Sequence, residues 1–181
     1  MQVQETKLKG CFIIEPAVFK DERGYFFESF NKQKFEELTG QNGNFVQDNQ
    51  SKSAYGVVRG LHLQEGAYAQ AKLVRVLEGC VLDVAVDLRA GSPTYGKWVA
   101  VELSAVNNRQ LYVPRGFAHG FSVLSGQAVF AYKCDNFYNK TAEIGIRYND
   151  PDLNIDWQIP EEKMLLSEKD LQLPFLSKIK I

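Results

Sequence analysis

The chain contains only two histidines, and the residues around each of them could do chemistry. His62 lies in the stretch VVRGLHLQEG, and His119 lies in PRGFAHG. A histidine in such a stretch can ligate a metal, exchange a proton near neutral pH, or be satisfied by hydrogen bonds inside a β-sheet. The neighbouring residues decide which of these roles the sequence predicts.

The spacing around both histidines resembles the paired motifs of the cupin superfamily. In metal-binding cupins the first motif carries two histidines and a glutamate, and the second motif carries one further histidine. Here Gln64 occupies the position of the second histidine, and residues 67–70 (AYAQ) fill the stretch where the glutamate would lie. A neutral amide is a poor substitute for imidazole on a transition metal. The sequence therefore predicts no metal site and leaves both histidines for proton chemistry or anion binding.

The residues flanking His62 indicate what kind of surface it lies on. Successive side chains of an extended strand point to opposite faces. The face that carries His62 also carries Gly60 and Gln64, whereas the opposite face carries Arg59 and two leucines. A small barrel normally packs its interior with apolar side chains. If His62 faces inward, that interior is polar and open, which indicates a ligand cavity; the alternative is a histidine satisfied within the sheet.

Both motifs lie in a chain that is rich in short predicted strands. Turn signals such as LEG, RAGSPTYG and PRG separate runs rich in Val, Leu, Phe and Tyr. These runs are about 6 to 10 residues long, a spacing that is typical of an antiparallel sandwich or barrel. The predicted fold is mainly β, a cupin-type antiparallel jelly-roll barrel or sandwich with a few short peripheral helices.

Two of those short helices can be placed on the sequence. The first spans residues 31–38, where Phe30 and Phe35 would form a hydrophobic staple around its first turn. The second begins at Ser167, with Asp170 three residues further on as in a capping box.

The composition is that of an ordinary globular protein, and we expect one domain over residues 1–181. The net charge of −1 provides no global field for nucleic acid or for an anionic membrane. Three widely spaced cysteines without a CxxC motif argue against a disulfide framework and a thiolate zinc site. We find no secretory leader or membrane span, so we expect a cytoplasmic protein with reduced thiols.

Many further stretches resemble one family, the dTDP-4-dehydrorhamnose 3,5-epimerases, which form the sugar-nucleotide branch of the cupins. The matching stretches occur in order and at matching separations over nearly the whole chain. They are DERGYFFESF, FVQDNQSKS, GVVRGLHLQ, AQAKLVRVLEG, DVAVDLRAGSPTYGKW, VPRGFAHGFSVLS, YKCDNFY, YNDP and LSEKD. The resemblance implies an enzyme that epimerises C3 and C5 of a dTDP-linked 4-keto-6-deoxyhexose without a cofactor, and so supplies the L-rhamnose precursor.

That reaction needs a small set of catalytic groups. Both carbons lie next to the C4 ketone, so each C–H proton can be lost to form an enolate. Inversion requires a base and an acid on opposite faces of the sugar ring, and a cation or donor at the enolate oxygen. The resemblance implies that His62 is the base, that Asp170 is its carboxylate partner, that Tyr132 is the acid and that Lys72 stabilises the enolate.

From the residues alone, simpler roles stay open for three of these groups. Asp170 could serve only the capping box with Ser167. Tyr132 lies in a good strand, where aromatic residues are common. Lys72, like Arg75 in the same run, could be a charge on an edge strand.

The resemblance also implies a set of groups that bind the nucleotide half of the substrate. Arg23 and Arg59 would bind the diphosphate, to which a guanidinium group is well suited. Tyr138 would stack on the thymine ring. The remaining implied substrate contacts are Glu28, Gln47, Asp48, Asn49, His119, Glu143 and Lys169.

Members of the family are generally homodimers in which the N-terminal segment joins the partner's sheet. The resemblance therefore implies a homodimer to which residues 1–30 contribute, with Arg23 and Glu28 serving the neighbouring site. Three other functions stay open: an epimerase that acts only at C3 or only at C5 of a related sugar, a metal-dependent cupin dioxygenase or isomerase, and a non-catalytic sugar-nucleotide-binding cupin.

Overall fold

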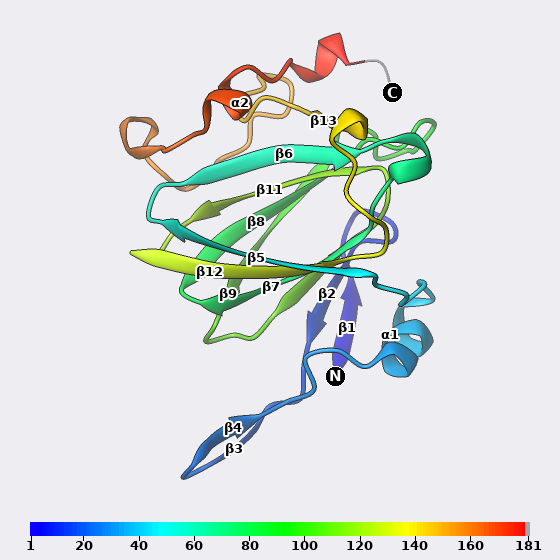
Figure 1. Cartoon of the computed structure of the whole chain (residues 1–181), viewed down its shortest axis with the longest axis vertical. Coiled ribbons are helices and arrows are strands. Elements are labelled where there is room, and N and C mark those ends of the chain that lie inside the picture. The colour runs from blue at the N-terminus through cyan, green and yellow to red at the C-terminus, as the bar shows by residue number, and fades with distance from the viewer. Residues whose placement is uncertain (180–181) are drawn as a thin grey trace.

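Two antiparallel β-sheets face each other in the computed structural model, which describes residues 1–179 (Figure 1). One sheet contains β1 (Gln2–Glu5), β2 (Phe12–Glu15), β5 (Gln47–Ala54), β7 (Lys72–Glu78), β10 (Gln110–Val113) and β12 (Gln127–Cys134). The other contains β6 (Val58–Gln64), β8 (Cys80–Asp87), β9 (Trp98–Ser104), β11 (Phe117–Val123) and β13 (Glu143–Gly145). Their strand orders are β1-β2-β10-β7-β12-β5 and β13-β6-β11-β8-β9. The predicted mainly β, antiparallel sandwich is confirmed.

The main apolar core involves side chains of both sheets. Val74 and Val76 of β7 belong to it from the six-stranded sheet, and Val81 and Ala85 of β8 belong to it from the five-stranded sheet. Because the strand period is two, the residue between Val74 and Val76 points away from this core. Lys72 shares the face of Val74 and Val76, so the same alternation directs it toward the space between the sheets.

A second apolar cluster covers the outer face of the five-stranded sheet. Leu82 and Val84 of β8 pack there with Ile146, Leu153 and Trp157 from the C-terminal part of the chain. That part crosses above β6 at the top of Figure 1. Strand β8 is thus buried on both faces, which explains why its sequence reads as a nearly continuous apolar run.

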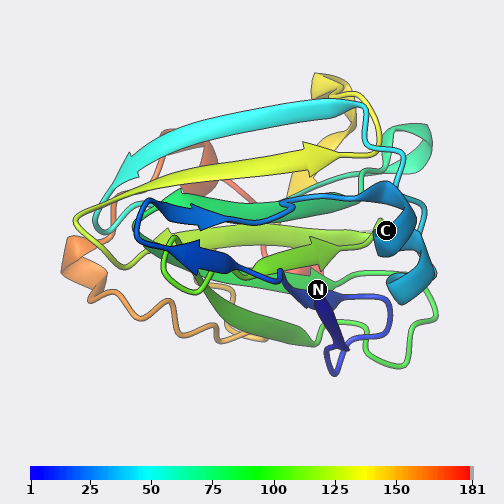
Figure 2. The same cartoon turned by 90° about the horizontal axis from the view of Figure 1, so that it is seen from below.

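The first predicted helix is confirmed as α1 (Lys32–Thr39), which lies at one end of the six-stranded sheet (Figure 2). The side chain of Asn31 accepts a 3.1 Å hydrogen bond from the backbone N–H of Lys34, which caps the first turn. The rings of Phe30 and Phe35 lie 5.9 Å apart between centroids, as expected for the staple. No helix within residues 1–179 is long and apolar enough to cross a membrane.

The second predicted helix is confirmed as the short α2 (Glu168–Leu171). Ser167 caps it, since its hydroxyl oxygen accepts a 3.1 Å hydrogen bond from the backbone N–H of Asp170. The carboxylate of Asp170 does not return the bond that a full capping box would contain. It reaches β6 instead, where it meets His62.

A hairpin near the N-terminus projects from the body of the molecule (Figure 1). It consists of β3 (Phe19–Asp21) and β4 (Gly24–Phe26), which within residues 1–179 pair only with each other. Phe19, Tyr25 and Phe26 are 67%, 62% and 67% exposed. We refer to residues 19–26 as the arm, and its exposed aromatic rings are unusual for a short surface hairpin.

Candidate active site

A cavity of about 620 Å³ lies between the two sheets and is lined by all four predicted catalytic side chains. Its wall includes His62, Lys72, Tyr132 and Asp170, together with His119. The five-stranded sheet contributes the two histidines, whereas the six-stranded sheet contributes Lys72 and Tyr132. The polar, open interior that the pattern around His62 predicted is therefore present.

His62 and Asp170 form a close pair at the wall of this cavity. The ring Nε2 of His62 lies 2.6 Å from Oδ1 of Asp170, and the Asp170 side chain is only 5% exposed. Burial acts to raise the pKa of Asp170, but the hydrogen bond from His62 and the positive charge of that ring and of Lys169 act against it, so the pKa falls below its ordinary value. Asp170 is thus a carboxylate at neutral pH. It orients the imidazole and stabilises the ring when it takes up a proton.

An irregularity in β6 brings Arg59 to the same cavity as His62. In the ladder with β11, His62 pairs with His119 and Arg59 pairs with Phe121, so three steps on β6 match two steps on β11. This bulge breaks the strict alternation of side chains. The expectation that Arg59 lies on the face opposite His62 is therefore wrong, because Arg59 also lines the cavity. Its Nε donates a 3.2 Å hydrogen bond to the Ser53 hydroxyl.

Tyr132 and Lys72 face His62 from the opposing sheet. They lie on the neighbouring strands β12 and β7, and the Nζ atom of Lys72 lies 6.0 Å from the centroid of the Tyr132 ring. Burial raises the pKa of the Tyr132 phenol, which keeps its proton at neutral pH, and burial lowers the pKa of Lys72. Strand β7 lies between β10 and β12, so the alternative of an edge-strand charge is wrong for Lys72.

His119 has a buried carboxylate partner that the sequence reasoning missed. Its Nε2 lies 3.0 Å from both carboxylate oxygens of Asp83, which is fully buried. Burial raises the pKa of Asp83, and the nearby His119 and Lys72 partly oppose that rise. The available signal was an aspartate at the centre of the otherwise apolar run CVLDVAV, since such a residue is rarely buried without a partner.

A smaller recess of about 110 Å³ adjoins this cavity and shares His62, Lys72 and Tyr132 with it. Tyr138 and Glu143 line the recess, where the Tyr138 hydroxyl donates a 2.8 Å hydrogen bond to Oε2 of Glu143.

Lys169 donates a 2.6 Å hydrogen bond to the same carboxylate oxygen of Glu143. Burial acts to raise the pKa of Glu143, but the bonds from Lys169 and Tyr138 lower it overall. The structure thus brings three of the predicted substrate contacts, Tyr138, Glu143 and Lys169, together beside the cavity.

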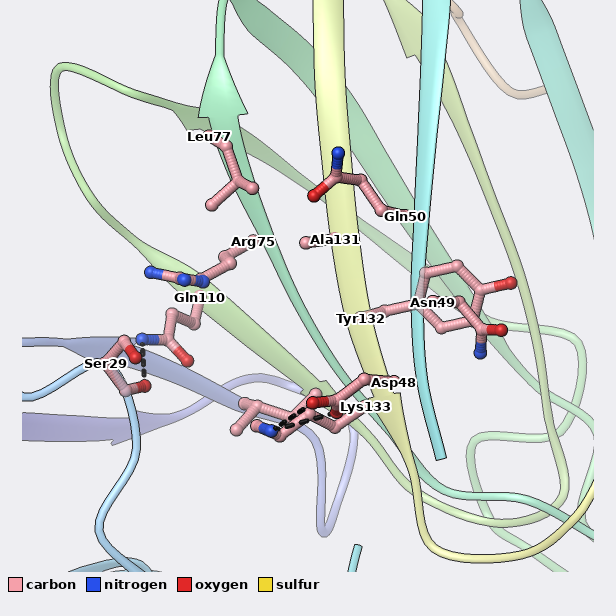
Figure 3. A pocket seen from close by; sticks show the side chains of 11 residues that line it. Ser29, Asp48, Asn49, Gln50, Arg75, Leu77, Gln110, Ala131, Tyr132 and Lys133 are labelled. Carbon is pink, nitrogen blue, oxygen red and sulfur yellow. Dashed lines mark hydrogen bonds and ion pairs between the residues drawn. The ribbon is translucent and has the colours of Figure 1, made fainter. Parts of the chain in front are cut away.

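The polar run 47–49 is divided between two faces of β5. Gln47 and Asn49 line the recess, but Asp48 points to the outer face of the sheet, where it pairs with Lys133 at 2.9 Å. A hollow of about 430 Å³ lies on that outer face and is drawn in Figure 3. In that view the Arg75 side chain and the Tyr132 ring point to opposite sides of the sheet. The alternation of an unbroken strand keeps the Asp48 side chain away from the cavity.

Arg23 and Glu28 lie away from the cavity of their own chain. Arg23 is in the arm, where it pairs with Asp21 at 2.6 Å, and Glu28 pairs with Lys34 at the start of α1. Neither residue lines the wall of the cavity or the recess. The structure of one chain does not bring these two predicted contacts to the site.

The donors around His62 do not form a metal-ligand set. Within residues 1–179, no group of three or more His, Cys, Asp or Glu side chains could hold a metal ion. Gln64, which occupies the place of a cupin histidine, uses its amide on backbone groups: Nε2 donates to the carbonyl oxygens of Tyr68 (3.0 Å) and Phe137 (3.2 Å). The residues present therefore do not fit the metal site of a metal-dependent cupin.

Comparisons with known proteins agree over nearly the whole chain. A sequence model of the dTDP-4-dehydrorhamnose 3,5-epimerase family matches residues 5–178. The curated enzyme of that name from Shigella flexneri is 57% identical over 171 residues, which cover 94% of this chain and 93% of that protein.

Two solved structures have the same fold. The crystal structure of dTDP-4-dehydrorhamnose 3,5-epimerase from Elizabethkingia anophelis has 64% identity and a TM-score of 0.96, and the match covers 100% of this chain and 99% of the other. A Legionella pneumophila epimerase in complex with dTDP-4-keto-L-rhamnose has 51% identity and a TM-score of 0.95, over 99% and 94% of the two chains. The sequence and the fold agree, and the chain belongs to the dTDP-4-dehydrorhamnose 3,5-epimerase family.

Proposed function

We propose that the chain epimerises dTDP-4-dehydro-6-deoxy-D-glucose at C3 and C5, without a cofactor, to give dTDP-4-dehydro-L-rhamnose for L-rhamnose biosynthesis. The observation that carries this proposal is the placement of His62 and Tyr132 on opposing sheets, with the cavity between them. A sugar ring bound between the sheets has a base on one face and an acid on the other. Inversion of a carbon centre needs that arrangement.

His62 removes the proton from C3 or C5, and the electron pair moves into the C4 carbonyl to give an enolate. The ammonium group of Lys72 stabilises the developing negative charge on O4, and the low-dielectric surroundings strengthen that interaction. Tyr132 then protonates the same carbon from the opposite face. The imidazolium and the phenolate exchange protons with water before the second centre reacts, so each epimerised carbon acquires a solvent proton.

The nucleotide half occupies the recess and its rim. Arg59 binds the diphosphate through its guanidinium group. Tyr138 is 53% exposed, so one face of its ring is available to stack on thymine. Gln47, Asn49, Glu143 and Lys169 supply polar contacts around it. His119, held by Asp83, contacts the sugar.

A second copy of the chain completes the site. The chain acts as one domain over residues 1–181, and its arm exposes aromatic rings that a partner would cover. The same arm carries Arg23, which lies away from the cavity of its own chain. A two-fold dimer would place each arm against the other body and add Arg23 and Glu28 to the partner's nucleotide site.

The working compartment that we propose is the cytoplasm, where thiols stay reduced. The cysteines at 11, 80 and 134 are all free, and Cys11 and Cys134 are buried.

Exchange in D2O tests the proposed reaction. The protein is supplied with dTDP-4-keto-6-deoxyglucose in the presence of EDTA, and deuterium incorporation is followed by NMR. We expect label at both C3 and C5. Label at C3 alone would assign the protein to the 3-epimerases, and exchange that appears only after a metal is added would exclude the metal-free mechanism.

The His62→Ala variant is the matched control for this experiment. It removes the base and leaves Arg59 and Tyr138 in place. We expect it to lose exchange while its affinity for dTDP stays within about twofold of the wild-type value. A large loss of dTDP affinity would instead identify His62 as a binding group.

A further inference from the structure

Gln64 is almost completely buried, with 5% of its surface exposed, and it lies two residues after His62 on β6. Its side-chain amide bonds to the backbone at three places. Nε2 donates to the carbonyl oxygens of Tyr68 and Phe137, and Oε1 accepts a 2.6 Å hydrogen bond from the backbone N–H of Asn139. Two of these backbone groups therefore directly flank Tyr138.

The segment that carries Tyr138 has no strand or helix to hold it. Residues 135–139 follow the end of β12, and we refer to them as the Tyr138 loop. Buried backbone groups outside regular structure need other partners. Two more side-chain amides serve this loop: Gln70 donates to the carbonyl oxygen of Asn136 at 2.7 Å, and Asn136 donates to that of Ala67 at 3.0 Å.

The Tyr138 ring itself is half exposed, so packing does not fix its position. Its backbone N–H donates to Oε1 of Gln47 at 3.2 Å, and its hydroxyl donates to Glu143. The hydroxyl bond holds one end of the ring, and the position of the other end depends on the path of the backbone on both sides of Tyr138. Gln64 holds that path, since it bonds to the residue before Tyr138 and to the residue after it.

We propose that Gln64 is a positioning residue for the nucleotide half of the substrate. Its hydrogen bonds connect the Tyr138 loop to the strand that carries His62. They thereby set the distance between the Tyr138 ring, which stacks on thymine, and the catalytic base His62. Residues two apart on a strand are separated by about 7 Å along it, so the two positions are rigidly related. This inference rests on the proposed function, because it takes Tyr138 as the stacking group.

A double-mutant cycle on dTDP binding tests the inference. Gln64→Met keeps the length of the side chain and removes its three hydrogen bonds, and Tyr138→Ala removes the ring. Calorimetric titration with dTDP gives the affinity of the wild type, both single variants and the double variant. We expect Gln64→Met to weaken dTDP binding about tenfold, within the range that base–aromatic stacking contributes. In the Tyr138→Ala background, the same change should have less than about a twofold effect.

Catalysis and stability provide the controls for this cycle. At saturating substrate, we expect the rate of deuterium exchange in Gln64→Met to stay within about threefold of the wild-type rate, because His62 and Asp170 are untouched. Ser122→Ala is the matched variant. It also removes a buried side-chain hydrogen bond to the backbone, in the neighbouring strand β11, where the Ser122 hydroxyl donates to the carbonyl oxygen of Trp157 at 2.7 Å. Its dTDP affinity should equal that of the wild type.

If Gln64→Met does not fold, Gln64→Asn provides the test, since it keeps a neutral amide that is one methylene too short to reach all three backbone partners and should weaken dTDP binding by a smaller factor. Equal losses in the two Tyr138 backgrounds would overturn the inference, as would an equal loss in Ser122→Ala or unchanged affinity in Gln64→Met. A wild-type protein that binds dTDP but exchanges no deuterium would refute the proposed reaction and leave the role of Gln64 intact.

Discussion

Asp170 does two things at the scale of a single residue. Its backbone N–H completes the cap of α2 with Ser167, and its carboxylate meets His62. The cap and the pair with the base are therefore not alternatives, because different atoms of the same residue serve them. The cap fixes the position of the residue from which the carboxylate reaches across to β6.

We expect Asp170→Asn to slow deuterium exchange about a hundredfold. The neutral amide carries no charge to stabilise the His62 imidazolium, and it orients the imidazole ring less firmly than the carboxylate does. The backbone cap is kept, so dTDP affinity should stay within about twofold. Rates at saturating substrate and calorimetric dTDP binding check both parts. Wild-type exchange in this variant would show that His62 works without its partner.

The pH dependence of exchange should reveal the role of Lys72. Burial lowers the pKa of Lys72, so its ammonium group loses the proton at a lower pH than an ordinary lysine does, whereas burial raises the pKa of Tyr132. The charged lysine is the active form, and exchange should therefore fall as pH rises through the lowered pKa. In Lys72→Arg, whose guanidinium stays charged, we expect a rate about tenfold lower and no such alkaline fall. If the exchange rate of Lys72→Arg still falls with rising pH as in the wild type, the fall is caused by loss of the Tyr132 proton instead.

The bulge in β6 is the feature of greatest consequence at the scale of the elements. It allows Arg59 and His62, which an unbroken strand would place on opposite faces, to line one cavity. Gly60 lies within the bulge at φ 111°, and β11 approaches it closely. A Cβ atom there would lie 2.7 Å from the carbonyl oxygen of His119 and 2.7 Å from Cα of Gly120.

Gly60→Ala should therefore lower the free energy of unfolding by about 2 to 4 kcal/mol, since it combines an unfavourable φ with a backbone clash. Gly66→Ala is the matched control, because Gly66 also has a positive φ of 60° but has nothing within 4 Å of the added Cβ. It should cost only about 1 kcal/mol. Urea denaturation of both variants measures the difference, and equal losses would show that the close approach to β11 is unimportant.

At the scale of the whole molecule, the arm and part of the outer face of the six-stranded sheet are exposed in the described chain. The C-terminal part of the chain packs on the outer face of the five-stranded sheet, whereas the arm stands away from the body with its aromatic rings exposed (Figure 1). The outer face of the six-stranded sheet carries the hollow of Figure 3. A dimer that buries the arm would explain its exposed rings and the distance of Arg23 from the cavity.

Subunit complementation tests this arrangement. If each site takes His62 from one chain and Arg23 from the other, a heterodimer of a His62→Ala chain and an Arg23→Ala chain contains one intact site. Purified from co-expressed, differently tagged chains, it should have about half the wild-type activity. The control heterodimer of His62→Ala with Tyr132→Phe should be inactive, because each of its bodies carries a defect. An inactive first heterodimer would show that the arm does not serve the neighbouring site.

The sequence by itself determined the class of the fold and most of the local structure. Short alternating runs and turn signals predicted the antiparallel sandwich. The cap and the staple of α1 could be predicted because each involves residues only a few positions apart in the sequence. The motifs around His62 and His119 carried the family resemblance, which the comparisons confirmed over residues 5–178.

The tertiary structure alone decided which side chains meet. The pairing of His62 with Asp170 joins residues 108 positions apart, and local periodicity carries no information about such a distance. The bulge at Gly60 depends on the register with β11, so the strand's own period of two placed Arg59 on the wrong face. Asp83 and Gln64 gained their roles from partners on other segments. Hydrogen bonds of this kind are set by how strands and loops pack, and only the folded chain brings their atoms within reach.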